Sequence, residues 1–352
     1  MTFDCVDDLP EIESLSKQWK ESIIEKPFVV DGLLRIGEKM ILSGESKAGK
    51  SFALIELCCA IASGTKWLGY YPCNKSRVLY VNFEIDRASF LHRITDVAKA
   101  LGLYDSSHEW TQNFATCNLR GYLTDTPKVL IPAIIRRAER HQAKCVVLDP
   151  IYKMGTGNEN SAQKIGEFCN GLDKIASKTN CAVIYCHHHP KGNQSWKKPI
   201  DRAAGSGVFA RDADVIIDII ELELPAEVRR SNICAWRFTP VTRGLPPQPP
   251  VDVWFNYPVH ELEHFGDTKC IIAPHHELPS YQRAMNARKS KEQKLAERKH
   301  RLEAAFDILT GRGETPTIKA LSEYMGVSEQ TVRNSVDEHI GFSRTSGKVA
   351  RV

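Results

Sequence analysis

The stretch SGESKAGKS, residues 43–51, is the feature that most constrains the fold of this chain. Four residues separate Gly44 from the run Gly49-Lys50-Ser51, which is the G-x-x-x-x-G-K-[ST] spacing of a phosphate-binding loop, or P-loop. The apolar run KMILS, residues 39–43, comes before it and predicts a strand, and a helix is expected to begin at Gly49. This strand–loop–helix context favours a P-loop over a chance glycine-rich turn.

Such a loop predicts a site for ATP and Mg²⁺. Glycines let backbone N–H groups surround an anion, and the N-terminus of the next helix adds partial positive charge. Lys50 is expected to reach the β- and γ-phosphates, and the Ser51 hydroxyl to bind Mg²⁺. The residues expected to contact the nucleotide are Gly44, Glu45, Ser46, Lys47, Ala48, Gly49, Lys50, Ser51, Phe52 and Asp149.

Two carboxylates follow apolar runs that read as strands. Asp149 ends CVVLD, residues 145–149, and is expected to hold the Mg²⁺ shell; the alternative is a helix-capping or turn aspartate. Glu84 follows the run 77–83 and is the candidate base that orients the attacking water, with Asp86 as a weaker candidate. The alternative for Glu84 is a surface turn residue.

Three histidines follow the fourth predicted strand, in IYCHHHPKG. They lie at the carboxyl edge of the sheet, where open α/β folds bind ligands. His187 or His188 is expected to sense the γ-phosphate and relay its loss to the next loop. A metal site is disfavoured because consecutive residues of a strand point to opposite faces, and a structural role remains the alternative.

Short apolar runs alternate with helical segments and predict an α/β fold. The expected strands are 39–43, 77–83, 145–149, 181–186 and 214–220, and the expected helices lie around 87–101, 129–142 and 167–178. This alternation indicates a mostly parallel sheet with helices on both faces. Two later runs, 233–241 and 251–257, predict an antiparallel hairpin that extends the sheet.

The chain is expected to have four parts. Residues 1–36 form a lead-in, 37–272 the ATPase domain, 273–301 a basic helical linker and 302–352 a small C-terminal domain. The clustered Lys and Arg residues of the linker fit either a solvated helix or a contact with the DNA backbone.

The C-terminal segment shows the spacing of a helix-turn-helix, followed by a possible short wing. The side chains expected to pack its two helices together are Ala320, Leu321, Met325, Val327, Val332 and Val336. Gln330, Thr331, Arg333 and Asn334 are expected to be exposed on the second helix and to contact DNA. The alternative is a winged helix that docks on protein.

Composition narrows the class of protein. The 352 residues are 42% apolar and 26% charged, which fits a soluble globular chain, and the net charge of +4 says little about partners. The 11 cysteines include no CxxC pair and are expected to be reduced, core-filling thiols. The N-terminus lacks the apolar stretch of a secretory signal, and the run 52–62 is too short to cross a membrane, so a cytoplasmic location is expected.

Together these motifs resemble the RecA-like superfamily of ATPases, and within it the RepA-type hexameric helicases of plasmids and phages. The segments that carry the resemblance are VDGLLRIGEKMILSGESKAGKS, WLGYYPCNKSRVLYVNFE, VVLDPIYKMGTGNENSA, VIYCHHHPKG and DRAAGSGVFARDADVIIDI, between about residues 30 and 220. The resemblance implies a ring, usually a homo-hexamer, with ATP at each subunit boundary. It also implies that Glu84 is the catalytic glutamate, that Asp149 is the Walker B aspartate, and that His188 with His187 couples the γ-phosphate to DNA-facing loops.

The resemblance further implies an arginine finger from the neighbouring subunit, and here the sequence departs from the pattern. The family often shows Arg-Gly-Ser before the fifth strand, whereas this chain has Ala204-Gly205-Ser206 with Arg202 two residues earlier. Arg243, in VTRG, is similar to the Arg of a K-x-R pattern in related helicases, but Val241 replaces the Lys. Arg243 is the first candidate and Arg202 the second.

Two loops are expected to contact DNA, at Thr156–Ala162 and Lys191–Arg202. The second carries Lys191, Trp196, Lys197, Lys198 and Arg202. Basic residues beside an aromatic suit single-stranded DNA, through phosphate pairing and base stacking. The alternative is a mobile, solvated loop.

Three functions fit these observations. The first is an ATP-driven DNA helicase or translocase for the replication of a mobile element, with replication proteins as possible partners and no membrane. The second is a DNA-binding regulator or loader that uses ATP to switch its assembly. The third is a metabolic P-loop kinase, which is disfavoured because no acceptor pocket is legible and the basic tail would have no role.

Overall fold

The computed structural model describes residues 12–19, 24–105, 108–122, 127–154, 162–189, 199–202, 208–222, 233–262, 296, 298–339 and 341–351. The chain divides into two compact units, Met1–His276 and Glu277–Val352.

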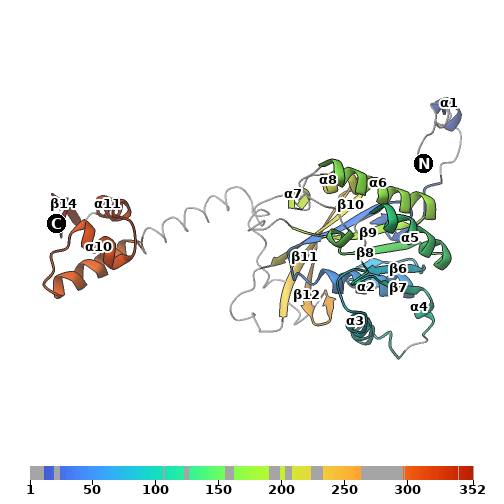
Figure 1. The fold of residues 1–352 in the computed structure, drawn as a ribbon, viewed down its shortest axis with the longest axis horizontal. Helices are drawn as coiled ribbons and strands as arrows, with labels where there is room; N and C mark the ends of the chain where they lie inside the picture. The colour runs from blue at the N-terminus through green and yellow to red at the C-terminus, as the bar shows by residue number, and fades with distance from the viewer. Residues whose placement is uncertain are drawn as a thin grey trace. The chain divides into compact units, whose positions relative to one another are not determined.

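A nine-stranded sheet forms the centre of the first unit (Figure 1). Its strands, in spatial order, are β13 (Val259–Glu261), β12 (Val251–Asn256), β11 (Ile233–Thr242), β10 (Val215–Leu222), β3 (Lys39–Gly44), β9 (Ala182–His188), β8 (Cys145–Asp149), β6 (Val78–Asn82) and β7 (Phe114–Asn118).

Neighbouring strands from β10 to β7 run parallel, whereas β11, β12 and β13 are joined to β10 as an antiparallel extension. The predicted mostly parallel sheet and its antiparallel hairpin are therefore confirmed. The strand that leads into the phosphate loop, β3, lies between β9 and β10, which come much later in the sequence. This order places the phosphate loop where crossover connections lead to opposite sides of β3, which is where open α/β sheets bind ligands.

Helices cover both faces of the sheet, as predicted (Figure 1). One face is covered by α2 (Lys50–Ser63), α3 (Arg87–Ala100) and α4 (Glu109–Gln112), and the other by α5 (Pro127–His141), α6 (Ala162–Thr179) and α8 (Val208–Asp212). Successive residues of β3 point to opposite faces of the sheet. Met40 and Leu42 belong to the core cluster under α2, and Ile41 belongs to the cluster under α5 and α6. A strand buried on both faces needs apolar residues throughout, which explains its continuous apolar run.

The helix α2 fixes the position of the phosphate loop. It is buried along nearly its whole length, from Ala53 to Ala62, and ends at Gly64, whose φ is 77°. A left-handed conformation of this kind favours glycine, so the helix stops where the sequence has one.

Several short elements were not expected from the sequence. They are β1 (Phe28–Val30), β2 (Leu34–Arg35), β4 (Lys66–Trp67), β5 (Tyr71–Pro72), η2 (Ile151–Met154), α7 (Pro199–Arg202) and the edge strands β7 and β13, whereas the short helix α1 (Leu15–Gln18) lies in the lead-in segment, where a short helix was expected. The sequence FATCN of β7 is neither alternating nor continuously apolar, so it carries no strand signal. Residues 29–34 include Val29, Val30, Leu33 and Leu34, which are buried in the core of this unit.

The second unit holds a helix over residues 298–311, then α10 (Ile318–Met325), α11 (Glu329–Asp337) and a hairpin of β14 (Phe342–Thr345) and β15 (Lys348–Arg351). The side chains of Thr317 and Ser328 cap α10 and α11, and Gly326, with φ 63°, forms the turn between them. Leu321, Val332 and Val336 are buried in one cluster, which confirms the predicted packing of the two helices.

The cysteines of the described segments are all free thiols: Cys58, Cys59, Cys73, Cys117, Cys145, Cys169, Cys181, Cys186 and Cys234. Over those same segments no helix is long and apolar enough to cross a membrane.

Candidate functional site

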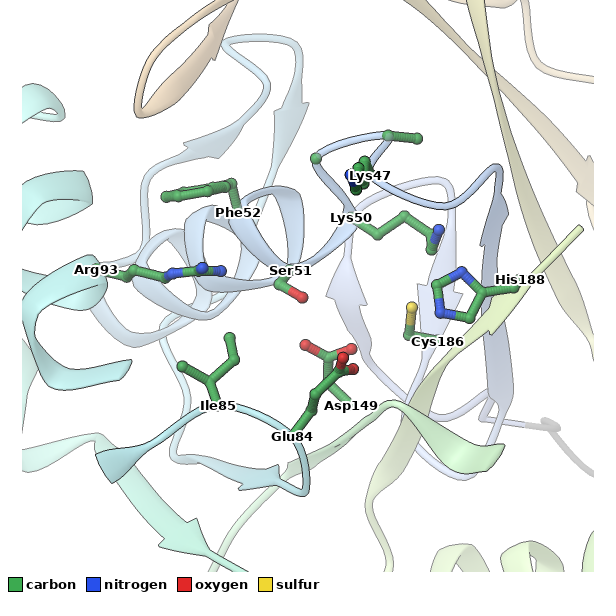
Figure 2. A pocket seen from close by; sticks show the side chains of 12 residues that line it. Lys47, Lys50, Ser51, Phe52, Glu84, Ile85, Arg93, Asp149, Cys186 and His188 are labelled. Atoms are coloured by element: carbon green, nitrogen blue, oxygen red, sulfur yellow. The ribbon is translucent and has the colours of Figure 1, made fainter. Parts of the chain in front are cut away.

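A cavity of about 340 Å³ opens at the carboxyl edge of the sheet, beside the phosphate loop (Figure 2). Its walls come from the loop and α2, from the ends of β6, β8 and β9, and from α3. They are formed by Lys47, Ala48, Gly49, Lys50, Ser51, Phe52, Glu84, Ile85, Arg93, Asp149, Cys186 and His188. Residues predicted from distant parts of the sequence thus meet in one place.

The phosphate loop needs its two glycines for different reasons. Gly49 has φ 70°, a left-handed conformation that side chains other than glycine rarely adopt. A Cβ on Gly44 would lie 3.2 Å from Cβ of Ile219 on β10, so a larger residue there would push the loop away from the sheet. Together they let the backbone curl as tightly as a phosphate cradle requires.

Lys50 points into the cavity from the first turn of α2 (Figure 2). Its Nζ donates hydrogen bonds to the carbonyl oxygens of Gly44, at 2.9 Å, and Glu45, at 2.5 Å. Burial lowers the pKa of Lys50, and nearby acidic groups, including Asp149, oppose that shift. A buried ammonium that is held by carbonyl oxygens at the phosphate loop can pair with a bound anion.

Asp149 ends β8 and is buried next to Ser51, with which it shares a hydrogen bond. The hydroxyl of Tyr80 on β6 donates a second hydrogen bond to Oδ2 of Asp149, at 2.6 Å. Burial raises the pKa of Asp149, whereas these two hydrogen bonds lower it. The Asp149 carboxylate and the Ser51 hydroxyl offer adjacent oxygen ligands, which are the ligands that Mg²⁺ prefers.

Glu84 follows β6 and is exposed to the cavity, where its carboxylate points toward the same space as that of Asp149 (Figure 2). The hydroxyl of Tyr152 donates a hydrogen bond to Glu84, and the Tyr152 ring lies 5.6 Å from that of His188. Asp86, the weaker candidate base, instead caps α3 by accepting hydrogen bonds from the backbone N–H groups of Ala88 and Ser89.

The three histidines have three different environments. His188 lines the cavity, and burial, together with the charge of Lys50, lowers its pKa to about 4, so the ring is neutral at pH 7. His187 points to the opposite face, where its buried ring lies 4.9 Å from that of Phe209, and it does not line the cavity. Nε2 of His189 lies 2.9 Å from Oδ1 of Asp218 on β10.

Arg243, the first candidate for the arginine finger, does not line this cavity. Arg243 follows β11 and forms an ion pair with Asp214, with 3.3 Å between Nη1 and Oδ1, while its Nη2 donates to the carbonyl of Arg211. Arg202 ends α7, and its side chain lies outside the described residues. An arginine that does line the cavity is Arg93, whose guanidinium lies 5.0 Å from the centre of the Phe52 ring.

The residues predicted to contact DNA are largely not described. Lys191, Trp196, Lys197 and Lys198 lie outside the described residues, as does most of the loop Thr156–Ala162. Arg333 and Asn334 lie on α11, where Arg333 pairs with Glu329 at 2.9 Å and Asn334 accepts a hydrogen bond from Gln330 at 2.9 Å.

Sequence reasoning missed several residues of the site: Tyr80, Ile85, Arg93, Tyr152 and Cys186. Tyr152 had a usable signal, since it comes three residues after Asp149 in the same segment. Tyr80 and Cys186 had no such signal, because an aromatic residue or a cysteine within an apolar run is usually a core residue. Among the described residues, no group of three or more His, Cys, Asp or Glu side chains could hold a metal ion by itself.

The mostly parallel sheet, the phosphate loop and the paired Asp149 and Ser51 define a P-loop ATPase. The family model described as the AAA domain matches residues 9–194, more than half of the chain, and the chain belongs to this family. Members of the family bind ATP with Mg²⁺, and the loop geometry and the oxygen ligands described above fit that pair.

Two solved structures resemble the chain more remotely. One is the ATPase domain of a phage helicase, with 14% sequence identity, a TM-score of 0.46, and coverage of 64% of this chain and 84% of that domain. The other is a KaiC-like protein from the archaeon Pyrococcus horikoshii OT3, with 14% identity, a TM-score of 0.45, and coverage of 64% of this chain and 88% of that one.

Proposed function

We propose that the chain is a RepA-type DNA helicase or translocase that hydrolyses ATP at the subunit boundaries of a ring, in the replication of a mobile element. The observation that carries the proposal is the meeting of Lys50, Asp149, Glu84 and His188 in one cavity. Phosphate binding, metal binding and water activation need these groups within reach of a single γ-phosphate.

The residues divide the work of hydrolysis among them. The loop N–H groups and Lys50 hold the phosphates, and Ser51 and Asp149 hold Mg²⁺, which would neutralise charge on the β- and γ-phosphates. Glu84 orients the attacking water and accepts its proton, while Tyr152 keeps the Glu84 carboxylate in place. His188 is neutral and can donate a hydrogen bond to the γ-phosphate without adding charge.

The openness of the site supports a ring. Glu84 is exposed, and Arg93, the arginine of the cavity wall, lies against Phe52. A second positive charge on the γ-phosphate would then come from a neighbouring copy, through Arg243 or Arg202. We propose single-stranded DNA as the partner of the basic segment Lys191–Arg202 and assign the chain to the cytoplasm.

The C-terminal unit fits a winged helix, with α11 as the second helix of a helix-turn-helix and β14–β15 as the wing. We propose that it recruits DNA or a replication protein. Several of its basic side chains are paired with acidic ones, as in the pairs Arg333–Glu329, Arg344–Asp337 and Arg351–Asp307.

A specific observation favours a second function, an ATP-switched DNA-binding regulator or loader without unwinding activity. Arg243 already has a partner in its own chain, Asp214. A switch needs only nucleotide-dependent assembly, whereas a motor needs an arginine that reaches the neighbouring site on every cycle.

Steady-state ATPase activity, measured with and without single-stranded DNA, tests the proposal. We expect DNA to stimulate turnover of the wild type and Glu84→Gln to lower kcat by about 100-fold or more, the usual effect of removing a general base. Glu139→Gln, on α5 outside the cavity, is the matched control and is expected to keep full activity. Slow turnover that DNA leaves unchanged would favour the regulator or loader.

A further inference from the structure

A buried polar pair connects the helix after the phosphate loop to the last strand of the sheet. Nδ1 of His260, on β13, donates a hydrogen bond of 2.6 Å to Oε1 of Glu56, on α2. The backbone N–H of His260 donates a second one, of 3.1 Å, to Oε2 of Glu56. Both carboxylate oxygens of Glu56 are therefore occupied by the same residue, 204 positions further along the chain.

Burying this polar pair carries a desolvation cost. The side chains of His260 and Glu56 are 0% and 2% exposed, and the rest of α2 around Glu56 is apolar. The His260 ring lies 4.7 Å from that of Phe255 and 5.4 Å from that of Phe238. Apolar side chains at both positions would join the sheet to the helix without any desolvation cost, so sheet-to-helix packing does not by itself account for the pair.

The position of Nε2, the other nitrogen of the His260 ring, suggests why a polar pair is buried here. Nε2 is buried and has no hydrogen-bond partner among the described residues. It lies 3.4 Å from the position that a Cβ would occupy on Gly49, the residue at which the phosphate loop becomes α2. A buried imidazole nitrogen without a partner is unfavourable unless another state of the protein provides one.

We infer that Glu56 and His260 form a positioning pair for the phosphate loop, in which Glu56 orients the ring so that Nε2 faces Gly49 and accepts a hydrogen bond from the loop when the loop takes up its phosphate-binding conformation. The inference rests on the proposed use of this loop for ATP. It makes β13 part of the nucleotide site, although no residue of that strand lines the cavity.

The two hydrogen bonds to Glu56 fix the orientation of the His260 ring. Because both His260 N–H and Nδ1–H bind the one carboxylate, the ring can neither flip nor slide relative to α2. The ring therefore moves as one with the helix. The pair acts on nucleotide affinity rather than on the chemical step, since it touches neither Glu84 nor the carboxylate of Asp149.

Two substitutions at His260 separate positioning from packing. In His260→Asn the side-chain amide replaces Nδ1–H and keeps the bond to Glu56, but nothing replaces Nε2. In His260→Gln the amide reaches the place of Nε2 but loses the bond of Nδ1. The full-length chain is titrated with a fluorescent ATP analogue at 10 °C, and its thermal unfolding temperature is measured in the same buffer.

We expect His260→Asn to weaken nucleotide binding by about tenfold, since one buried hydrogen bond is worth roughly that factor. Its Tm is expected to fall as well, because a smaller side chain replaces a buried ring. His260→Gln is expected to lower Tm while it keeps affinity within about threefold of the wild type. Wild-type affinity in the Asn variant, or losses of affinity that simply follow the losses of Tm, would overturn the inference. A wild type that does not bind the analogue overturns the proposed ATP site itself.

Discussion

The hydroxyl of Tyr80, on β6, donates a 2.6 Å hydrogen bond to Oδ2 of Asp149, at the end of the neighbouring strand β8. Both groups are fully buried, and the bond opposes the rise in the pKa of Asp149 that burial causes. Tyr80 therefore helps to keep the carboxylate ionised and aimed at Ser51, although it lines no part of the cavity itself.

Tyr80→Phe is expected to raise the Mg²⁺ concentration needed for half-maximal ATPase activity by roughly three- to tenfold. The reason is that the pKa of Asp149 rises further once the hydrogen bond is lost, which disfavours the charged form that binds the metal. Urea unfolding of Tyr80→Phe is expected to show that the free energy of unfolding falls by about 1–2 kcal/mol. A Mg²⁺ titration of the variant checks the first effect.

Tyr185→Phe is the matched control for Tyr80→Phe. Tyr185 is equally buried, and its hydroxyl has no hydrogen-bond partner in the part of the chain that the structure describes. Its loss is expected to leave the Mg²⁺ dependence unchanged and stability within about 0.5 kcal/mol. Equal shifts in the two variants would assign the Tyr80 effect to packing instead.

His187 is expected to make the protein less stable as pH falls. Burial lowers its pKa from 6.5 to about 4, with smaller contributions from His188, His189 and Lys50. The unfolded chain therefore takes up a proton below pH 6.5 that the folded chain takes up only near pH 4. The free energy of unfolding is expected to be unaffected above pH 6.5, to drop by about 1.4 kcal/mol at pH 5.5, and to lose up to about 3 kcal/mol by pH 4.

Urea unfolding of wild type and His187→Gln at pH 7.5, 6.5 and 5.5 measures how much His187 contributes to the pH dependence of the free energy of unfolding. The variant is expected to show a shallower fall, though not a flat line, because the pKa of His188 is also lowered. His108→Gln, at an exposed position, should reproduce the wild-type slope. If His187→Gln did so as well, another group would have to be responsible.

Mixing two kinds of variant subunit tests whether Arg243 is the arginine finger. Arg243→Ala alone is expected to lower kcat by about 1000-fold or more, the usual value of an arginine finger. Because a finger acts on the neighbouring site, mixing Arg243→Ala with Glu84→Gln subunits is expected to restore part of the ATPase activity. A fully active Arg243→Ala variant with a lower Tm would show that the ion pair with Asp214 is structural, and Arg202 would be tested next.

Glu329 is expected to restrain DNA binding by α11. It pairs with Arg333 at 2.9 Å, so Glu329→Gln should free the guanidinium and raise affinity for duplex DNA by about threefold at low salt. Arg333→Ala should weaken binding. Glu314→Gln removes the same charge from an exposed loop residue and is the control. Unchanged affinity in both α11 variants would favour the protein-docking alternative.

Much of the fold and part of the site could be predicted because the signals are local. β8 has the predicted bounds, and α3 ends within a residue of them, since each is a single run of one hydrophobic period. The places of Glu84 and Asp149 in the cavity could be predicted because each follows or ends such a run, at the carboxyl edge of the sheet. Glu56 was visible only as a charge in an apolar stretch, and His260 as an unremarkable residue near the end of the sheet.

The sequence by itself determined the phosphate loop, the class of fold and the carboxylates that surround the cavity, because spacing along the chain encodes them. Only the tertiary structure decided which histidine enters the cavity, and it did so by the alternation of β9, which turns His188 toward Lys50 and His187 toward Phe209. It also decided the partners of Asp149, Glu84 and Glu56. Those contacts join residues up to 204 positions apart, and only the order of strands in the sheet brings them within hydrogen-bonding distance.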